Sequence, residues 1–461
     1  MSRIIIRNCS ILTLDDKDTF LYPATLVIQD DRIVDIFEGE KDLTSSIPTT
    51  IIDGTDKLVM PGLVDLHFHT SVAKGYNDTL PLWEYLDTVW YPSIRALTPH
   101  GALTAALHSY TTALKSGTTT VNDMYRFVPS LASAARQTGI RAFLANDIAL
   151  PSHRLDTLAD NVAAYHAHDE AASGGRVRVW MGVEWLPLAD EALLREIGDA
   201  ARELRTGVHV HLCESASEVA DTATRYGSSG DGDGDGKKRT PVEVARDAGL
   251  LGPNTVAAHC VHLSDSDIEI LAATGTHVSW NPGSNAKLGN GVARVGEMVA
   301  AGVNVGVGVD ACECHNSTDL FETMKIGSYV RKVEGRDAGV GQAGEILRMA
   351  TGNGARALGV DAGVLEKGRK ADVIVLDLRK DMMFTPLLKE KGERRKMLES
   401  HLVFGCNGTA VETVIVDGRI VVEERKVLGV DEEQLRRDMD ELFEGLVDEM
   451  EKQRYDREKA Q

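Results

Sequence analysis

Cysteine is scarce in this chain, and no long stretch of it is uniformly apolar. The six cysteines among the 461 residues show no disulfide-framework spacing, so we expect reduced thiols. The first residues lack an apolar signal core, and no apolar run reaches the length that spans a bilayer. We therefore expect a soluble, cytoplasmic protein without a membrane partner.

The chain also contains fewer positively charged than negatively charged residues. Lys and Arg number 50 against 70 Asp and Glu, which gives a net charge of -20. This balance argues against a polyanionic partner such as nucleic acid. The chain is longer than one ordinary domain, but barrel enzymes often exceed about 250 residues as one unit. We expect one large domain and one smaller piece.

Both ends of the chain show a β pattern. Residues 1–57 contain alternating apolar positions and a turn, and residues 361–428 contain a strand and a hairpin. The hairpin has Asp417-Gly418 at its tip, a dipeptide that suits a type I′ turn. We expect the two segments to complete one small β-sandwich domain together.

The last segment, residues 429–461, is predicted to be a helix. Asp431 is a suitable N-cap, and apolar residues recur after it at helical spacing. We expect this apolar stripe to pack on the protein body or on a second subunit.

Between these segments, residues 58–360 alternate short apolar runs with helical patterns such as 102–115 and 265–273. Eight β-then-α units over roughly 300 residues predict a closed parallel (β/α)8 TIM barrel in the α/β class. A doubly wound open sheet is the alternative, but no phosphate-binding glycine motif follows the first strand. The predicted strands are 63–66, 118–121, 140–144, 177–181, 208–212, 256–259, 277–280 and 303–308.

One interruption of this pattern contains Asp231–Gly236. Its D-x-D-x-D-G spacing matches the opening of a calcium loop, but the twelfth position is Val242, where a bidentate Glu is required. Glycine dominates the segment. We interpret it as a flexible surface insertion.

The first barrel strand ends in two histidines, His67 and His69. Successive side chains on a strand point to opposite faces, so these two share a face while Phe68 points the other way. Two neutral imidazoles aimed at one point make half of a metal site. Two core histidines with backbone partners are the alternative.

Other barrel strands deliver similar groups to the end where barrel active sites lie. Strand five carries His209 and His211 on one face, with Glu214 just beyond it. Strand six ends in His259, and strand eight leads to Asp310. Imidazoles or carboxylates at four strand ends predict a metal centre, although the residues alone do not separate His209 from His211 as the ligand.

The histidine motif belongs to a series of segments: MPGLVDLHFH (60–69), SGTTT (116–120), HLCE (211–214), AHCVHL (258–263), NPGSN (281–285) and GRKADV (368–373). This series, over nearly the whole chain, resembles the amidohydrolase superfamily. It is most similar to the single-metal branch, which includes cytosine, guanine and adenosine-analogue deaminases and triazine hydrolases. The series is much less specific to substrate.

The resemblance implies that His67, His69, His211 and Asp310 hold one divalent metal ion, zinc by default and iron as the rival. Fold-mates with two metals use a carboxylated lysine on strand four. Residues 177–181 contain no lysine, which favours one metal. Dimers are common in this branch, so a homodimer or larger homo-oligomer is expected.

The mechanism that the resemblance implies is attack of metal-bound hydroxide on a ring carbon. Asp310 would take the proton of the water, and His259 would orient the water and stabilise the developing charge. Glu214 would protonate a ring nitrogen and then the departing amine. The protein is thus expected to be a metal-dependent aminohydrolase for an amino-substituted N-heterocycle, such as a purine, pterin, triazine or nucleoside-like compound.

Substrate recognition departs from the adenosine-analogue deaminases. Glu184 stands where their pattern has a base-contacting histidine, and Trp83 stands near the position of a ribose-binding acid. We predict that Trp83 stacks on a flat, amino-rich heterocycle and that Glu184 accepts its N–H donors. Tyr85 replaces the usual tryptophan nearby. His262 is a further candidate for substrate contact, with a structural hydrogen bond as the alternative.

Three alternatives remain. The same metal could open a cyclic amide or displace a leaving group other than an amine, and the chain could be an inactive scaffold, which the intact set of site residues argues against. A thiolate metal site at Cys312-Glu313-Cys314-His315 is disfavoured because zinc motifs space their cysteines by two or more residues.

Overall fold

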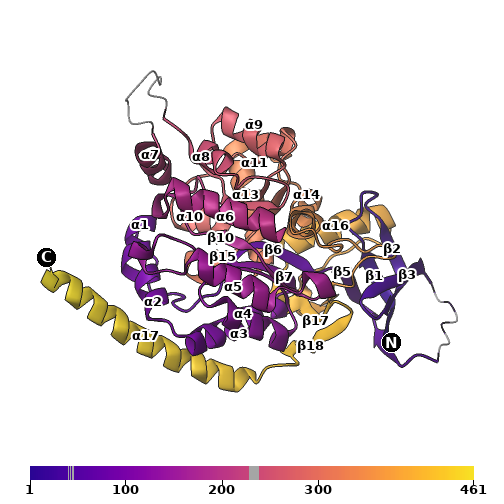
Figure 1. The fold of residues 1–461 in the computed structure, drawn as a ribbon. Coiled ribbons are helices and arrows are strands. Elements are labelled where there is room, and N and C mark those ends of the chain that lie inside the picture. The colour runs from indigo at the N-terminus through magenta and orange to yellow at the C-terminus, as the bar shows by residue number, and fades with distance from the viewer. Residues whose placement is uncertain (40, 42, 44–45, 228–237, 461) are drawn as a thin grey trace.

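The computed structural model describes residues 1–39, 41, 43, 46–227 and 238–460. A parallel β barrel surrounded by helices forms the larger part, and a sheet built from both chain ends lies at its side (Figure 1). The predicted insertion Asp231–Gly236 lies outside the described residues. No helix in the described ranges is both long enough and apolar enough to cross a membrane.

The barrel contains each of the eight predicted strands. They are β6 (Leu63–His69), β7 (Thr118–Met124), β8 (Arg141–Ala145), β9 (Val177–Val179) with β10 (Met181–Val183), β11 (Val208–Leu212), β12 (Thr255–His259), β13 (His277–Trp280), and β14 (Val305–Val307) with β15 (Asp310–Ala311).

Strands four and eight are each interrupted. The first half of strand four, β9, pairs with β8, and the second half, β10, pairs with β11. In strand eight, β14 pairs with β13 and β15 pairs with β6. The two five-stranded sheets therefore join into one ring of eight parallel strands, and the predicted fold class is confirmed.

Helices connect the strands and cover the outside of the barrel (Figure 1). The predicted helices over 102–115 and 265–273 are α3 and α9. In α9, a capping box joins Ser264 and Asp267, as expected for a helix that starts after a serine. The covering helices are α3 (Pro99–Lys115), α4 (Val128–Thr138), α5 (Leu158–His168), α6 (Glu191–Leu204), α7 (Ala216–Arg225), α8 (Pro241–Asp247), α9 (Asp265–Thr274), α10 (Pro282–Lys287), α11 (Val295–Ala300), α12 (Cys312–His315), α13 (Leu320–Gly335), α14 (Ala343–Arg348) and α15 (Gly354–Ala357).

Three consecutive short helices lie between β6 and α3. They are α1 (Leu82–Tyr85), the π-helical turn η1 (Leu86–Trp90) and α2 (Tyr91–Ala96). Their apolar residues are mostly buried, and four of them contribute to the wall of the cavity at the histidines. This segment therefore covers the end of the barrel where the metal ligands are expected.

The sheet at the side of the barrel combines both chain ends. β16 pairs antiparallel with β5, so the C-terminal strands continue the N-terminal sheet. Asp417 and Gly418 both have positive φ, at 52° and 72°, as the predicted type I′ turn requires. Its strands are β1 (Arg3–Leu12), β2 (Phe20–Gln29), β3 (Arg32–Glu38), β4 (Thr49–Asp53), β5 (Lys57–Pro61), β16 (Val373–Asp377), β17 (Val411–Val416), β18 (Arg419–Glu423) and β19 (Lys426–Val427).

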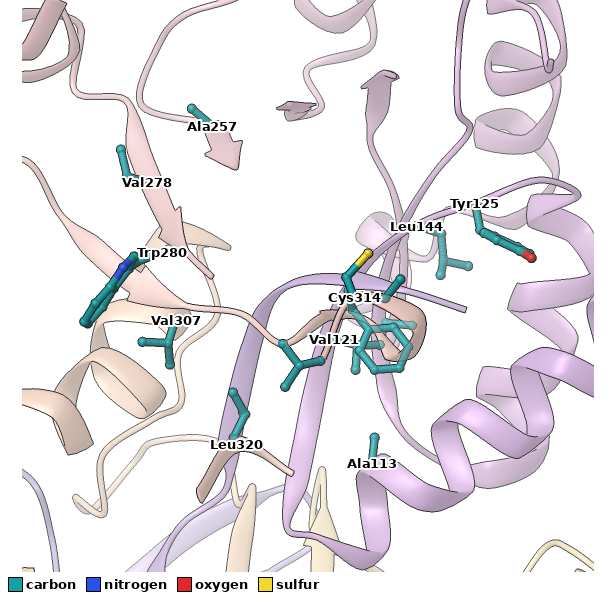
Figure 2. Close-up of a cluster of buried hydrophobic side chains, with 14 of the residues drawn as sticks. Ala113, Val121, Tyr125, Leu144, Ala257, Val278, Trp280, Val307, Cys314 and Leu320 are labelled. Atoms are coloured by element: carbon teal, nitrogen blue, oxygen red, sulfur yellow. The ribbon is translucent and has the colours of Figure 1, made fainter. Parts of the chain in front are cut away.

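The two largest hydrophobic clusters of the described residues hold these parts. The larger core lies between the barrel strands and the helices, and Figure 2 shows part of it, with Val121 and Leu144 on strands and Ala113 on α3. A second core lies within the side sheet and includes Ile6 and Val373 from the two chain ends. The boundaries of the four predicted domain segments stay a prediction.

The C-terminal helix α17 (Glu432–Ala460) runs along α3 and α2 and carries the chain end away from the barrel (Figure 1). Asp431 accepts the Gln434 N–H at 3.0 Å, as predicted for an N-cap. Leu446 and Met450 are buried, and Phe443 packs against Tyr76. The apolar stripe therefore packs on the body of the protein.

Another segment joins the barrel to the side sheet. The helix α16 (Lys391–Phe404) follows β16, and the cysteine Cys406 lies just beyond it.

All six cysteines are free and buried.

Candidate active site

The strand β6 places His67 and His69 at the C-terminal end of the barrel. Both are buried, and Phe68 between them packs toward Tyr110 on the other side of the strand. His69 Nδ1 hydrogen-bonds to the Met124 carbonyl oxygen at 2.5 Å. If the ring donates this hydrogen bond, its Nε2 is left as a bare lone pair, which is the form that a metal ligand requires.

Two further groups meet these nitrogens. His211, on β11, has its Nε2 3.1 Å from His69 Nε2. Asp310 Oδ1 lies 3.4 Å from the Nε2 atoms of both His67 and His69. The structure thus brings together three imidazoles and one carboxylate, which is the group that the sequence predicts to hold the metal.

The donor set fits a divalent metal ion. His67, His69 and His211 offer ligand atoms within 4.8 Å of one another, and so do His67, His259 and Asp310. His67 Nε2 is buried and has no hydrogen-bond partner in the described chain. Buried nitrogen and oxygen donors at this spacing suit zinc or another first-row metal.

His209 occupies a different position from His211, although both lie on β11. His209 Nε2 is 2.8 Å from His67 Nδ1, on the side of the His67 ring away from Asp310. It belongs to neither group of candidate ligands. His209 therefore lies next to His67, a predicted ligand, at the ring nitrogen that faces away from Asp310. The Nε2 atom of His211 instead lies close to the Nε2 atom of His69, another predicted ligand.

His259 and Glu214 lie beside the predicted metal position. His259 Nε2 is 3.6 Å from Glu214 Oε2 and 3.9 Å from Asp310 Oδ2. The other ring nitrogen of His259 contacts Asn285 Oδ1 at 2.9 Å, and Asn290 donates a hydrogen bond to Glu214 at 2.8 Å. Both predicted proton-transfer groups are therefore held in place by amides.

The surroundings tune these groups in ways that suit the predicted chemistry. Burial lowers the pKa of His211 well below its usual value, which keeps the imidazole neutral. Burial, together with the charge of Asp310, raises the pKa of Glu214 well above its usual range. Burial also opposes ionisation of Asp310, but contact with His67 and the other imidazoles holds its pKa well below normal.

A cavity of about 350 Å³ opens from this centre. Glu184 lies in its wall, where the Tyr91 hydroxyl donates to it at 3.3 Å and burial raises its pKa to about 7. The lining residues are His69, Leu82, Tyr85, Leu86, Trp90, Glu184, Trp185, His211, Glu214, His259, Leu288, Asp310, Ala311 and Cys314.

The structure does not bring Trp83 and His262 to the cavity wall. The Trp83 ring packs on Trp185 with ring centres 4.6 Å apart, and its indole N–H donates to Ser217 Oγ at 2.6 Å. His262 Nε2 hydrogen-bonds to the Asn290 carbonyl oxygen at 2.8 Å. The aromatic residue in the wall is instead Trp185.

Sequence reasoning missed several residues of the site. Trp185 directly follows Glu184 at a strand end, and this adjacency was an available signal. Asn285 ends the recognised NPGSN segment. Tyr85 was noted only as the replacement of a usual tryptophan, and Asn290 gave no signal of its own, because its position depends on how loops fold over the barrel.

The segment that follows Asp310 forms α12 and does not gather into a thiolate site. Cys314 lines the cavity, whereas His315 contacts the Thr323 hydroxyl at 3.1 Å. Among the residues that the structure describes, the groups with metal-binding geometry are the two at the histidine centre.

Known proteins resemble this chain in sequence over most of its length. The model of the amidohydrolase family matches residues 58–421. A 5'-deoxyadenosine deaminase of Methanosarcina barkeri is 35% identical over 452 residues, which cover 97% of this chain and 99% of that protein. A 5-methylthioadenosine/S-adenosylhomocysteine deaminase of Acetivibrio thermocellus is 34% identical over 448 residues, with 96% and 99% covered.

Solved structures share the fold. The crystal structure of an adenosine deaminase from Xanthomonas campestris with bound zinc has a TM-score of 0.86 and 23% sequence identity. It covers 96% of this chain and 98% of its own. From the family model, the relatives and the fold together, the chain belongs to the amidohydrolase family.

Proposed function

We propose that the protein is a zinc-dependent aminohydrolase that releases ammonia from an amino-substituted N-heterocycle. It is a hydrolase of C–N bonds other than peptide bonds, in keeping with its family and its deaminase relatives. One observation carries the proposal: the buried convergence of His67, His69, His211 and Asp310 beside Glu214 and His259.

The metal would be held by three histidines and one aspartate. When bound, it supplies Lewis acidity, which lowers the pKa of a water molecule to about 7. The solved neighbour with zinc and the N/O donor set support zinc as the ion, with iron as the rival.

The residues around the metal would divide the proton transfers. Asp310 accepts a proton from the attacking water, and His259, fixed by Asn285, stabilises the oxygen as it bonds to the ring carbon. Glu214, kept protonated by burial, donates to a ring nitrogen. Glu214 then takes the proton of the new hydroxyl group and passes it to the amine, so that the carbon–nitrogen bond breaks, the ring carbonyl forms and ammonia leaves. The proton held by Asp310 restores Glu214 to its protonated form.

The cavity supports a flat substrate. Glu184 would accept N–H groups of the ring, and Trp185 takes the place in the wall that was expected for Trp83. The relatives are named for adenosine-type compounds, which places a purine ring among the candidates. A homodimer or larger assembly in the cytoplasm completes the proposal, and light scattering on purified protein would measure its size.

The test is ammonia release by metal-replete protein across purines, pterins, triazines and nucleosides, with Asp310→Ala as the blank. Ammonia from at least one compound, absent in the variant, supports the aminohydrolase. Release of chloride, a thiol or a ring-opened acid without ammonia would instead support a different hydrolysis at the same centre. No product from any compound would contradict the proposal.

A further inference from the structure

The hydroxyl group of Tyr85 lies where a ligand could form a hydrogen bond with it. It lies on α1, is 3% exposed and lines the cavity beside the metal centre. Its Oη has no hydrogen-bond partner in the described chain. Buried polar groups almost always have a partner, and leaving one without a partner is costly. The atom therefore marks a place in the wall where a ligand atom can hydrogen-bond.

The surroundings of Tyr85 determine what kind of ligand atom fits. Burial raises its pKa well above the usual range, with the acidic groups Glu313, Cys314 and Asp310 acting in the same direction. The hydroxyl therefore keeps its proton. Glu313 uses one carboxylate oxygen to accept the N–H groups of Val72 and Ala73 at 2.8 and 2.6 Å, and its other carboxylate oxygen, like Tyr85 Oη, has no hydrogen-bond partner in the described chain. Because no protein group accepts its proton in a hydrogen bond, Tyr85 is available as a donor to a ligand oxygen or nitrogen.

Glu184 in the same wall has the opposite requirement. With a pKa of about 7, Glu184 is ionised in part at neutral pH and fully above it, and in that form it accepts hydrogen bonds and needs N–H donors from the ligand. On an adenosine-type ring, the N–H donors are those of the amino group that leaves, and the other edge atoms are bare nitrogens. A ring amide offers an N–H and a carbonyl oxygen side by side. It can therefore satisfy both Glu184 and Tyr85.

We propose that Tyr85 is a specificity-determining residue that donates a hydrogen bond to a ring carbonyl of the substrate, while Glu184 accepts the ring N–H. The preferred substrates are then amino-substituted heterocycles with a ring amide. The inference rests on the proposed function for its reaction, but the hydrogen bond can be tested by binding alone.

The turnover test compares guanine with 2-aminopurine. Both carry the amino group at the same carbon, and only guanine has the ring amide. We expect wild-type protein to prefer guanine in kcat/KM by at least about 10-fold, and Tyr85→Phe to lower kcat/KM for guanine about 10- to 100-fold while 2-aminopurine is unchanged. Adenosine and 5'-deoxyadenosine serve as the nucleoside comparison.

Tyr125→Phe is the matched control. Tyr125 is also buried, its hydroxyl also has no partner in the described residues, and it packs on the same Trp90 from outside the cavity lining. Its replacement removes the same atom from a similar environment. We expect it to leave the guanine preference unchanged, with metal content equal to that of wild type.

The binding test uses two rings that carry no amino group, hypoxanthine and purine, measured by calorimetry on metal-replete protein. Tyr85→Phe should weaken hypoxanthine binding about 10-fold and leave purine binding unchanged. Equal effects on both rings, no effect on either, or no binding of either ring to wild type would overturn the inference. If no compound releases ammonia, the proposed function is wrong, and the binding comparison still decides the role of Tyr85.

Discussion

Both ends of the barrel bury charged groups, but they differ in whether the protein supplies hydrogen-bond partners for the buried polar atoms. At the N-terminal end, Arg141 donates to both carboxylate oxygens of Asp372 at 2.9 and 3.0 Å and to Asp417 at 3.3 Å. Lys370 also reaches Asp417, at 2.7 Å. At the C-terminal end, several buried atoms, including His67 Nε2 and Tyr85 Oη, have no hydrogen-bond partner in the described chain.

The difference indicates what each end is for. The Arg141 cluster is completed by the protein itself, because Arg141 begins β8 while Asp372 precedes β16 and Asp417 lies in the hairpin after β17. It therefore joins the barrel to the side sheet. Under the proposed function, a metal and a substrate complete the histidine end. In barrels generally, the first kind of site supports stability and the second supports chemistry.

The largest expected effect is at the histidine end. Asp310→Ala removes one metal ligand and the proposed proton acceptor, so we expect kcat to fall by about 10³-fold or more and bound metal to fall with it. Metal analysis and ammonia release measure the two losses. Full activity in this variant would contradict the assigned site.

Glu214→Gln tests the proposed acid without touching the metal. We expect kcat to fall by about 10²- to 10⁴-fold with metal content unchanged. Because burial and Asp310 raise the pKa of Glu214 well above its usual range, the carboxyl keeps its proton to higher pH than usual and loses it as the pH rises through that pKa. Wild-type activity should therefore decline on the alkaline side. A pH profile of the variant that keeps the same decline would assign it to another group.

Arg141→Met probes the opposite end of the barrel. It leaves Asp372 buried without its cation, so we expect the free energy of unfolding to fall by about 3–5 kcal/mol in denaturant titration. Metal content and kcat of the folded protein should stay near wild type. The double variant with Asp372→Leu should regain part of the loss. A loss of kcat without a loss of stability would show that the two ends are not separate.

The sequence predicted much of this comparison, because strand periodicity and short motifs carry local information. The eight strands, the turn at Asp417-Gly418 and the convergence of His67 with β11 histidines and Asp310 follow from patterns within a few residues or from the order of barrel strands, whereas the choice of His211 over His209 came from the family resemblance. Arg141 and Asp372 could not be paired in advance, since they are 231 residues apart and meet only through the folded chain ends.

The positions of residues in connecting segments are the other part of the site that the sequence could not predict. The placement of Trp83 depends on how α1 crosses toward α7, and its contacts with Trp185 and Ser217 direct the ring away from the cavity. His262 similarly turns to a loop carbonyl of Asn290. Periodicity fixes the face of a strand, but it does not fix the path of a connecting segment.

His209 gives the smallest predicted effect and the finest test of the histidine end. On β11 it shares a face with His211, so strand periodicity alone could not separate them. In the structure its Nε2 lies 2.8 Å from His67 Nδ1, where it can accept the ring proton and leave His67 Nε2 free for the metal. His209 is thus a positioning residue for a ligand.

His209→Ala should therefore weaken metal affinity by about 10- to 100-fold, measured by competition with a chelator. His209→Gln keeps a hydrogen-bond acceptor and should recover part of that affinity, whereas a purely structural role would give both variants the same loss. His211→Gln is the matched comparison on the same strand, and it should release the metal more completely than either. If His209→Ala and His211→Gln weakened metal binding equally, the two histidines would both be ligands, and the distinction that the geometry draws between them would be lost.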